Sequence, residues 1–358
     1  MTFNTPTPKQ LGFHFPAEFA EQRALWLSWP HKEASWPGKL RTIYNPYAEF
    51  ILQVASHQKV NINVADDQMK QFAIAAIQNS AYAQTVNLSQ LMQNVTFYFH
   101  PTNDAWCRDH GPAFLVNREA GKKVIVDWGY NAWGDKYPPY DLDDNIPTRI
   151  GEKLNLPVFY PNIVMEGGSV EFNGKGTLMT TTACLLNENR NPHLNQNQIE
   201  KYLSDYYGAD HILWLGDGII GDDTDGHIDD ITRFVNHDTV VTVVEENKND
   251  ENYEILQENL SLLKKMRLEN GKQLNIVELP MPKGIVYEDQ RLPASYANFY
   301  ISNEKVIVPI FRDDKNDQKA LEVIESCFPD RKVVGIDSVD LIWGLGSFHC
   351  LSQQEPAL

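Results

Sequence analysis

Cysteine is scarce in this chain, and the few cysteines lie far apart. The 358 residues include 4 cysteines, at Cys107, Cys184, Cys327 and Cys350, and no Cys-x-x-Cys pair occurs. This spacing excludes the common zinc-binding signatures and a disulfide framework built on closely spaced cysteines. It is typical of a protein from a reducing compartment, where a functionally important cysteine is more often catalytic than bridged.

Long apolar runs and an excess of positive charge are also missing. No run approaches the length of a membrane span, and the N-terminal segment MTFNTPTPKQLGFHFPAEF lacks the apolar core of a secretion signal. Lys and Arg total 31 against 48 Asp and Glu, so the net charge is −17. We therefore expect a cytoplasmic protein that binds neither membrane nor nucleic acid, because phosphate binding needs clustered Lys and Arg. The acidity suits a cationic ligand, but it also simply favours solubility.

What the chain does contain is an alternation of strand-like and helix-like segments. Short β-branched or aromatic runs bounded by turn residues occur at 60–65, 95–100, 123–128, 211–215, 239–244, 274–279 and 306–311. Helical patterns cover 253–270 and 318–328, and we predict Asp317 as the N-cap of the second. This alternation predicts an α/β fold, but the spacing alone fits one large domain or two.

One segment, GDDTDGHIDD at 221–230, is unusually polar and lies between an apolar run and a strand-like run. It does not fit a calcium loop, because the first ligand position is Gly221 and the last is Thr232. Three interpretations stay open: a transition-metal site on His227 and Asp229, an acid–base site in which carboxylates tune the histidine, and a solvated turn without a chemical role. We expect His227 and Asp229 at the start of an extended strand, where residues two apart share a face.

Three further clusters place reactive residue types beside strand-like segments. Asp109 follows Trp106 in WCRDHGPAF, and a carboxylate next to an aromatic ring suits a cation. Glu166 precedes a glycine pair in MEGGSVEF, and Cys350 follows the glycine-rich turn in WGLGSFHCLS. Taken singly, these are explained by a surface salt bridge, a tight turn and a buried structural cysteine. Taken together with His227, they supply a nucleophile, an acid–base group and carboxylates.

These segments occur together in one known family. The chain resembles the agmatine deiminases of the guanidino-group-modifying superfamily, and bacterial peptidylarginine deiminases look similar in the same motifs. The matching segments, in the family's order, are FPAEFAEQRALWLSWP (15–30), WCRDHGPAF (106–114), EGGSVEFNGKGTLMTTTACLLNENRNP (166–192), DDTDGHIDDITRF (222–234), ASYANFYISNEKVIVP (294–309) and FHCLSQQEP (348–356). The resemblance implies a five-bladed α/β propeller with pseudo-fivefold symmetry, formed as a single catalytic domain over residues 1–358, with a central active site.

The resemblance also implies the chemistry. Agmatine would be hydrolysed to N-carbamoylputrescine and ammonia through an amidino-thioether on Cys350, without a cofactor or a metal. Asp109 and Asp229 would bind the guanidinium, and His227 would transfer protons. Glu166 would orient His227 and raise its pKa. Trp106, Asp223 and Asp225 are expected as further substrate-binding residues.

Alternatives remain at this point. Arginine in peptides or another guanidine could be the substrate. Outside the family, the chain could be a metal-dependent hydrolase using His227, Asp223, Asp225 and Asp229, or a polyamine-binding module without catalysis. The sequence leaves the oligomeric state open, with a homo-oligomer as one alternative. One departure from the family stands out: three consecutive glycines and Asn usually precede the nucleophile, but here the turn is Gly344-Leu345-Gly346-Ser347, where a positive φ would strain Leu345.

Overall fold

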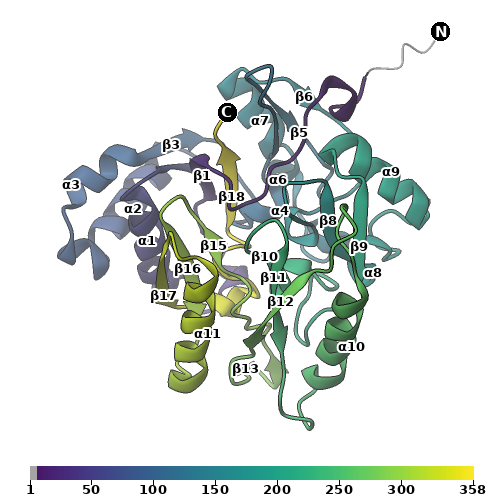
Figure 1. Ribbon diagram of the computed structural model, residues 1–358. Coiled ribbons are helices and arrows are strands. Elements are labelled where there is room, and N and C mark those ends of the chain that lie inside the picture. The colour runs from purple at the N-terminus through teal and green to yellow at the C-terminus, as the bar shows by residue number, and fades with distance from the viewer. Residues whose placement is uncertain (1–5) are drawn as a thin grey trace.

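Small sheets of one recurring pattern surround a common centre (Figure 1). The computed structural model describes residues 6–358, and within that range five sheets of three or four strands form, together with a two-stranded hairpin. In four of the sheets, the first two strands run antiparallel and the last two run parallel. These observations confirm the expected α/β propeller.

The four sheets follow one another along the chain. They consist of β4 (Ala113–Asn117), β5 (Lys122–Val126) and β6 (Val158–Phe159); β7 (Glu171–Phe172), β8 (Thr177–Thr181) and β9 (His211–Leu215); β10 (Thr232–Phe234), β11 (Thr239–Val244) and β12 (Asn275–Pro280); and β15 (Tyr300–Ile301), β16 (Lys305–Ile310) and β17 (Lys332–Asp337). The hairpin is formed by β13 (Val286–Tyr287) and β14 (Gln290–Arg291).

The fifth sheet joins the two ends of the chain. Its strands, in spatial order, are β18 (Ser352–Pro356), β1 (Gln22–Ser28), β2 (Lys59–Val64) and β3 (Val95–Phe99). β18 pairs antiparallel with β1, and the yellow strand lies beside the purple one in Figure 1. The C-terminal strand therefore takes the place that the first strand has in each other sheet, and it fixes the segment that precedes it near the centre.

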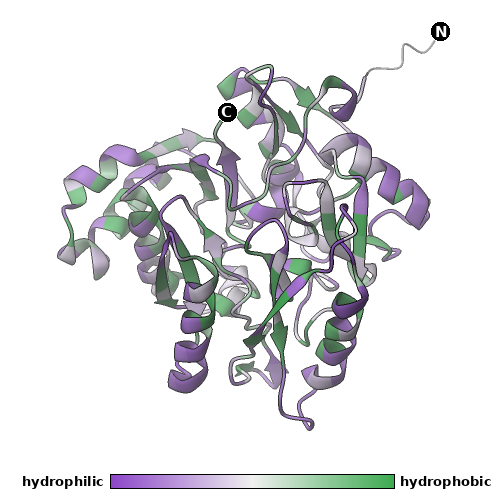
Figure 2. Cartoon of the chain, viewed as in Figure 1, coloured by the Kyte–Doolittle hydropathy of each residue, from purple (hydrophilic) through white to green (hydrophobic). Residues whose placement is uncertain are grey.

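Helices provide the crossovers that parallel strands require. They are α1 (Leu40–Ala55) between β1 and β2; α2 (Asp67–Gln78) and α3 (Leu88–Leu91) before β3; α5 (Ala132–Asp135), α6 (Asp141–Asp144) and α7 (Ile146–Leu154) before β6; α8 (Thr182–Leu185) and α9 (Gln196–Tyr207) before β9; α10 (Asn252–Lys265) before β12; and α11 (Asp314–Cys327) before β17. The short helix α4 (Cys107–His110) instead connects β3 to β4, which belong to different sheets. The helices carry mostly hydrophilic residues on the outside, whereas the strands between them include many hydrophobic ones (Figure 2). Within residues 6–358, no helix is long and apolar enough to cross a membrane.

The predicted strands are all present with small shifts at their ends, and both predicted helices exist with different bounds. α10 ends at Lys265, earlier than predicted, because the chain turns there and Arg267 forms a bridge with Gln273. The prediction of Asp317 as the N-cap of α11 was wrong, because the N-cap is Asp313. Asp317 lies inside the helix and is buried, because it accepts hydrogen bonds from Tyr296 Oη (2.6 Å) and Phe311 N (2.9 Å).

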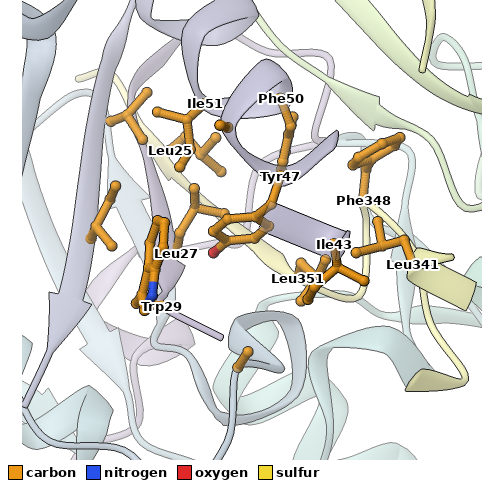
Figure 3. Packing of buried hydrophobic residues seen from close by; sticks show 14 of the residues in the cluster. Leu25, Leu27, Trp29, Ile43, Tyr47, Phe50, Ile51, Leu341, Phe348 and Leu351 are labelled. Atoms are coloured by element: carbon orange, nitrogen blue, oxygen red, sulfur yellow. The ribbon is translucent and has the colours of Figure 1, made fainter. Parts of the chain in front are cut away.

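A hydrophobic cluster anchors the C-terminal segment beside α1. Tyr47 and Phe50 of α1 pack with Phe348 and Leu351, and all four side chains are fully buried (Figure 3). Burial of each such side chain contributes about 1.5–3 kcal/mol to folding. Because Phe348 and Leu351 stand on either side of His349 and Cys350, this packing holds those two residues in a defined position.

Candidate active site

Cys350 lies at the wall of a cavity of about 220 Å³ between the sheets. Trp106, Asp109 and Asp223 line the same cavity, so four of the site residues predicted from the sequence meet there. Asp225 does not line it. Instead, Asp225 accepts hydrogen bonds from Lys136 Nζ (2.8 Å) and other donors outside the cavity.

The turn before Cys350 contains two positions, Gly344 and Gly346, where only glycine fits. A side chain on Gly344 would meet the Trp36 ring at 2.5 Å, and one on Gly346 would meet the Trp106 ring at 2.5 Å. Leu345, between them, adopts φ 70° and ψ 15°, so the positive φ considered from the sequence does occur at this residue. The backbone here therefore keeps the left-handed turn even with a leucine in the middle.

The Cys350 thiol is surrounded by acidic groups. Burial raises the pKa of this thiol well above its ordinary value, and Asp229, Asp230 and Asp109 raise it further. Asn298, which sequence reasoning did not identify, donates from Nδ2 to the Cys350 sulfur at 2.9 Å. The Asn298 Oδ1 atom accepts from the backbone N–H of His349 (3.1 Å). The cysteine is therefore a neutral thiol, which accepts from the Asn298 amide and donates to Asp229 Oδ2 at 3.7 Å.

Asp109 is held at the inner end of the cavity by two donors. Its Oδ1 accepts from the Gly168 N–H and its Oδ2 accepts from Trp133 Nε1, each at 3.0 Å. Burial raises the pKa of Asp109 to about 6, the neighbouring Asp229 adds to the rise, and His227 opposes it. A side chain on Gly168 would lie 2.5 Å from His227 Nδ1, so the glycine pair after Glu166 lets the backbone approach the site closely.

Trp133 reaches Asp109 from a rare backbone conformation. Ala132, Trp133, Gly134 and Asp135 have φ values of 48°, 58°, 89° and 61°, so four consecutive residues are left-handed. Left-handed conformations cost roughly 1–2 kcal/mol per non-glycine residue. The sequence contained no signal for this turn except its glycine and the asparagine before it, Asn131, whose Oδ1 accepts from the Gly134 N–H (2.9 Å).

His227 is fully buried next to the carboxylates of Asp109 and Asp229. Its Nδ1 lies 3.8 Å from Asp109 Oδ1 and 4.0 Å from Asp229 Oδ1. Burial alone would lower the pKa of His227, but Asp109 and Asp229 help to raise it well above its ordinary value. The expected extended strand at this point was wrong: Ile228–Asp230 is a 3-10 helix, and β10 begins only at Thr232. The tight turn brings His227 and Asp229 to the same place by a different geometry.

Asp222 fixes the backbone of the acidic loop. Its Oδ2 accepts from the backbone N–H groups of Gly226 (3.0 Å) and His227 (2.9 Å). The aspartates of this loop therefore have different tasks. Asp222 shapes the turn, Asp223 faces the cavity, and Asp225 pairs with cations of neighbouring segments.

Asp229 is held by a buried chain of hydrogen bonds that runs through His349 to Glu18. Asp229 Oδ2 contacts His349 Nδ1 at 2.6 Å, and His349 Nε2 contacts Glu18 Oε2 at 2.7 Å. Because ionised carboxylates can only accept, both ring nitrogens of His349 donate. Burial raises the pKa of Asp229, but the bond and charge of His349, together with the charges of His227 and Arg233, lower it below its ordinary value. Sequence reasoning missed His349 and Glu18, although both lie in the segments that carry the resemblance.

Glu18 is the meeting point of two buried arginines. It accepts from Arg233 Nη2 at 2.9 Å and from Arg108 Nη2 at 3.4 Å. Arg108 and Asp109 are neighbours in the short helix α4. The Arg108 guanidinium also donates to Gln354 Oε1 (2.7 Å), so it belongs to the support behind the site.

Glu166 is fully buried and paired with Arg190 through Oε1. Its Oε2 has no hydrogen-bond partner within the described part of the chain. Glu166, Cys184 and His227 each offer a ligand atom within 4.8 Å of the others, as do Asp229, Asp230 and Cys350. These two clusters could hold a metal ion, but Arg190 already neutralises Glu166. Neither cluster in residues 6–358 contains Asp223 or Asp225, so the metal set considered from the sequence does not assemble.

Comparisons with known proteins point to one family. Residues 14–356 match the family model described as Porphyromonas-type peptidyl-arginine deiminase. The agmatine deiminase of Enterococcus faecalis is 34% identical in sequence and similar in structure, with a TM-score of 0.89 over 99% of both chains. A cysteine-to-serine variant of the C. jejuni agmatine deiminase, solved with substrate bound, is 35% identical, with a TM-score of 0.84 over 96% of both chains.

Proposed function

We infer that this chain, which belongs to the Porphyromonas-type peptidyl-arginine deiminase family, hydrolyses agmatine to N-carbamoylputrescine and ammonia. The supporting observation is that one buried centre combines the Cys350 thiol, the His227 imidazole and the carboxylates of Asp109 and Asp229. A planar cation is the ligand that two such carboxylates fit best, because guanidinium N–H groups form charge-assisted bonds in pairs.

The two carboxylates have complementary parts in binding the guanidinium. Asp229 stays ionised through its bond to His349, and its Oδ1 has no hydrogen-bond partner within residues 6–358. Asp109 ionises near pH 6 and is oriented by Gly168 and Trp133. A guanidinium held between them would present its central carbon to Cys350.

Binding of the cation activates the nucleophile. The carboxylates that raise the pKa of the Cys350 thiol become neutralised once a guanidinium lies between them. The thiol then gives its proton to solvent water, and the thiolate attacks the guanidinium carbon to give a tetrahedral adduct. His227, protonated because its pKa is raised, donates its proton to the departing nitrogen, and ammonia leaves.

The second half of the reaction reverses these roles. An amidino-thioether remains on Cys350, and neutral His227 takes a proton from water as the water oxygen attacks the same carbon. The C–S bond then breaks, the sulfur takes up the proton of the new hydroxyl group, and the neutral ureido product leaves with the Cys350 thiol restored. Glu166 stands within 4.8 Å of His227 and would orient it, although its main partner is Arg190.

The cavity favours an amine tail over an amino acid tail. Arginine's α-carboxylate would need an unpaired cation, but the cation of the lining is Lys32, which pairs with Asp104 at 3.4 Å. Asp223 in the lining would face the distal ammonium of agmatine and share its charge between that group and Lys136, 3.6 Å away.

The direct test is an assay for ureido product with agmatine, free arginine and an arginine-containing peptide, each with and without EDTA. We expect product from agmatine alone, at equal rates with and without EDTA. Product from the peptide alone would support the proposed reaction but show that the substrate is arginine in peptides and not agmatine. Activity abolished by EDTA would support a metal-dependent hydrolase, and binding of agmatine without ammonia release would support a binding module.

Trp133→Phe tests how Asp109 is oriented. The substitution removes the indole N–H that donates to Asp109 Oδ2 and keeps an aromatic ring at the cavity wall. A hydrogen bond to a charged group contributes about 1.5–3 kcal/mol, so we expect kcat/KM for agmatine to fall at least about tenfold. Trp29→Phe is the control, because the buried Trp29 Nε1 has no partner within the described residues. Equal losses in both variants would contradict the assigned contact.

His349→Gln tests the support of Asp229 through pH dependence. In the native protein, the acid limb of kcat/KM should lie near pH 6, where Asp109 ionises. Without His349, the pKa of the buried Asp229 rises, so a second carboxylate must also lose a proton before the cation can bind. We expect the limb to steepen and move up by about one to two pH units.

The control for His349 is His100→Gln, which changes a buried histidine that bonds Asn63 Oδ1 at 3.0 Å, away from the cavity lining. This variant should keep the native limb. If His349→Gln lowers thermal stability and activity but leaves the limb in place, His349 has only a structural role.

A further inference from the structure

The outer part of the cavity has one apolar wall. Tyr287, Trp343 and Leu345 line it and pack, partly buried, against the hydrophobic cluster below. The rings of Tyr287 and Trp343 lie with their centroids 4.1 Å apart, and Leu292, almost fully buried, adds to the same wall. An alkyl chain that extended from Cys350 towards the opening would therefore meet hydrocarbon along this side.

The two other carboxylates of the lining, those of Asp104 and Asp223, are already paired within the chain. Asp104 contacts Lys32 (3.4 Å) and accepts from Ser35 Oγ (2.5 Å). Asp223 contacts Lys136 (3.6 Å) and accepts from the hydroxyl of Tyr137. A charged tail would share Asp223 with Lys136, whereas an uncharged tail would leave these pairs intact.

Leu345 is a residue whose backbone conformation does not favour it. Its φ of 70° lies in the left-handed region, where glycine is the preferred residue, and glycines stand on both sides of it. When a residue adopts an unfavourable backbone conformation close to a reactive group, its side chain is a candidate for a function. What the leucine adds here is its contact surface in the cavity wall.

We propose that this enzyme also deiminates guanidines whose tail is an uncharged alkyl chain, and that Leu345, with Tyr287 and Trp343, binds that tail. The proposal rests on the proposed deimination and adds a substrate class to it, the N-alkylguanidines. In the reaction, the N-alkylguanidinium and water give the N-alkylurea and ammonium, through the same attack by Cys350. The guanidinium stays between Asp109 and Asp229, so only the tail contacts differ from those of agmatine.

The test compares kcat/KM for agmatine, n-butylguanidine and n-hexylguanidine, with the alkylureas and ammonia as measured products. We expect both alkylguanidines to be turned over, and n-hexylguanidine to exceed n-butylguanidine about tenfold, because two more methylenes contact the wall. Leu345→Gly should reduce this ratio to about threefold, because Tyr287 and Trp343 remain in the wall. Leu345→Asn, which tolerates the left-handed conformation and removes the apolar contact, should have the same effect.

Asn155→Gly is the control for placing glycine at a left-handed position, since Asn155 has φ 54° at the end of α7. It should leave the ratio unchanged. Turnover of agmatine without turnover of either alkylguanidine would overturn the proposal and leave the proposed function standing. If the ratio of kcat/KM for n-hexylguanidine to that for n-butylguanidine is unchanged in both Leu345 variants, Leu345 does not bind the tail. Turnover of none of the three guanidines would overturn the proposed function and this proposal with it.

Discussion

Replacing Cys350 with serine is expected to lower kcat for agmatine by about 10⁴-fold or more. The hydroxyl of serine fits in the space of the thiol. The acidic surroundings that already keep the thiol neutral make ionisation of a hydroxyl far less favourable still. Even with a guanidinium bound, serine would supply no anion able to attack. Ureido product should therefore fall to background, while agmatine still binds between Asp109 and Asp229.

Two measurements separate loss of chemistry from loss of structure. Acid-quenched native enzyme should carry the amidino group on the peptide that contains Cys350, as seen by mass spectrometry, and the serine variant should carry none. Cys327→Ser, in the half-buried part of α11, is the matched control and should keep full activity. Substantial turnover by Cys350→Ser would mean that water attacks the guanidinium directly and that the thiol is not the nucleophile.

The parts of the fold that could be predicted from the sequence are those encoded locally. The strand at 239–244 and helix α11 each show a hydrophobic pattern and a composition typical of their type within one short stretch of sequence. Both were therefore predicted. The pairing of β18 with β1 depends on residues more than 300 positions apart, and no local pattern in SQQEP indicates a buried strand. The same holds for Asp317, whose partners Tyr296 and Phe311 come from outside its helix.

The candidate site divides in the same way. Asp109, His227, Asp229 and Cys350 were proposed because their residue types and the family resemblance agree with the chemistry, and the structure brings them to one buried centre. The hydrogen-bond partners that hold them in place were not found. His349 contacts Asp229, Trp133 contacts Asp109 and Asn298 contacts Cys350 only because distant segments meet at the centre of the sheets. Sequence patterns indicate reactive groups better than they indicate what tunes them.

Replacing His227 with asparagine is expected to reduce kcat about 10³-fold, because one residue provides both the acid for ammonia departure and the base for water attack. The pH profile gives the more specific prediction. Since the pKa of His227 is raised, the imidazolium is present through neutral pH and is lost as the pH rises past that value. Native kcat/KM, which reports the free enzyme, should therefore show a basic limb, and His227→Asn should lack it. His57→Asn, at a partly exposed histidine bonded to Ser302, should keep the native profile.

A substrate with a better leaving group distinguishes the two tasks of His227. In the S-methylisothiourea analogue of agmatine, methanethiol departs in place of ammonia, and a thiolate leaves with little need for a proton donor. His227→Asn should then release methanethiol in a burst of about one equivalent per active site, because Cys350 still attacks. The steady rate after the burst should stay low, because no base activates water for the second step. Absence of the burst would mean that His227 is needed for formation of the thiolate itself, and the activation of Cys350 by the bound cation alone would be wrong.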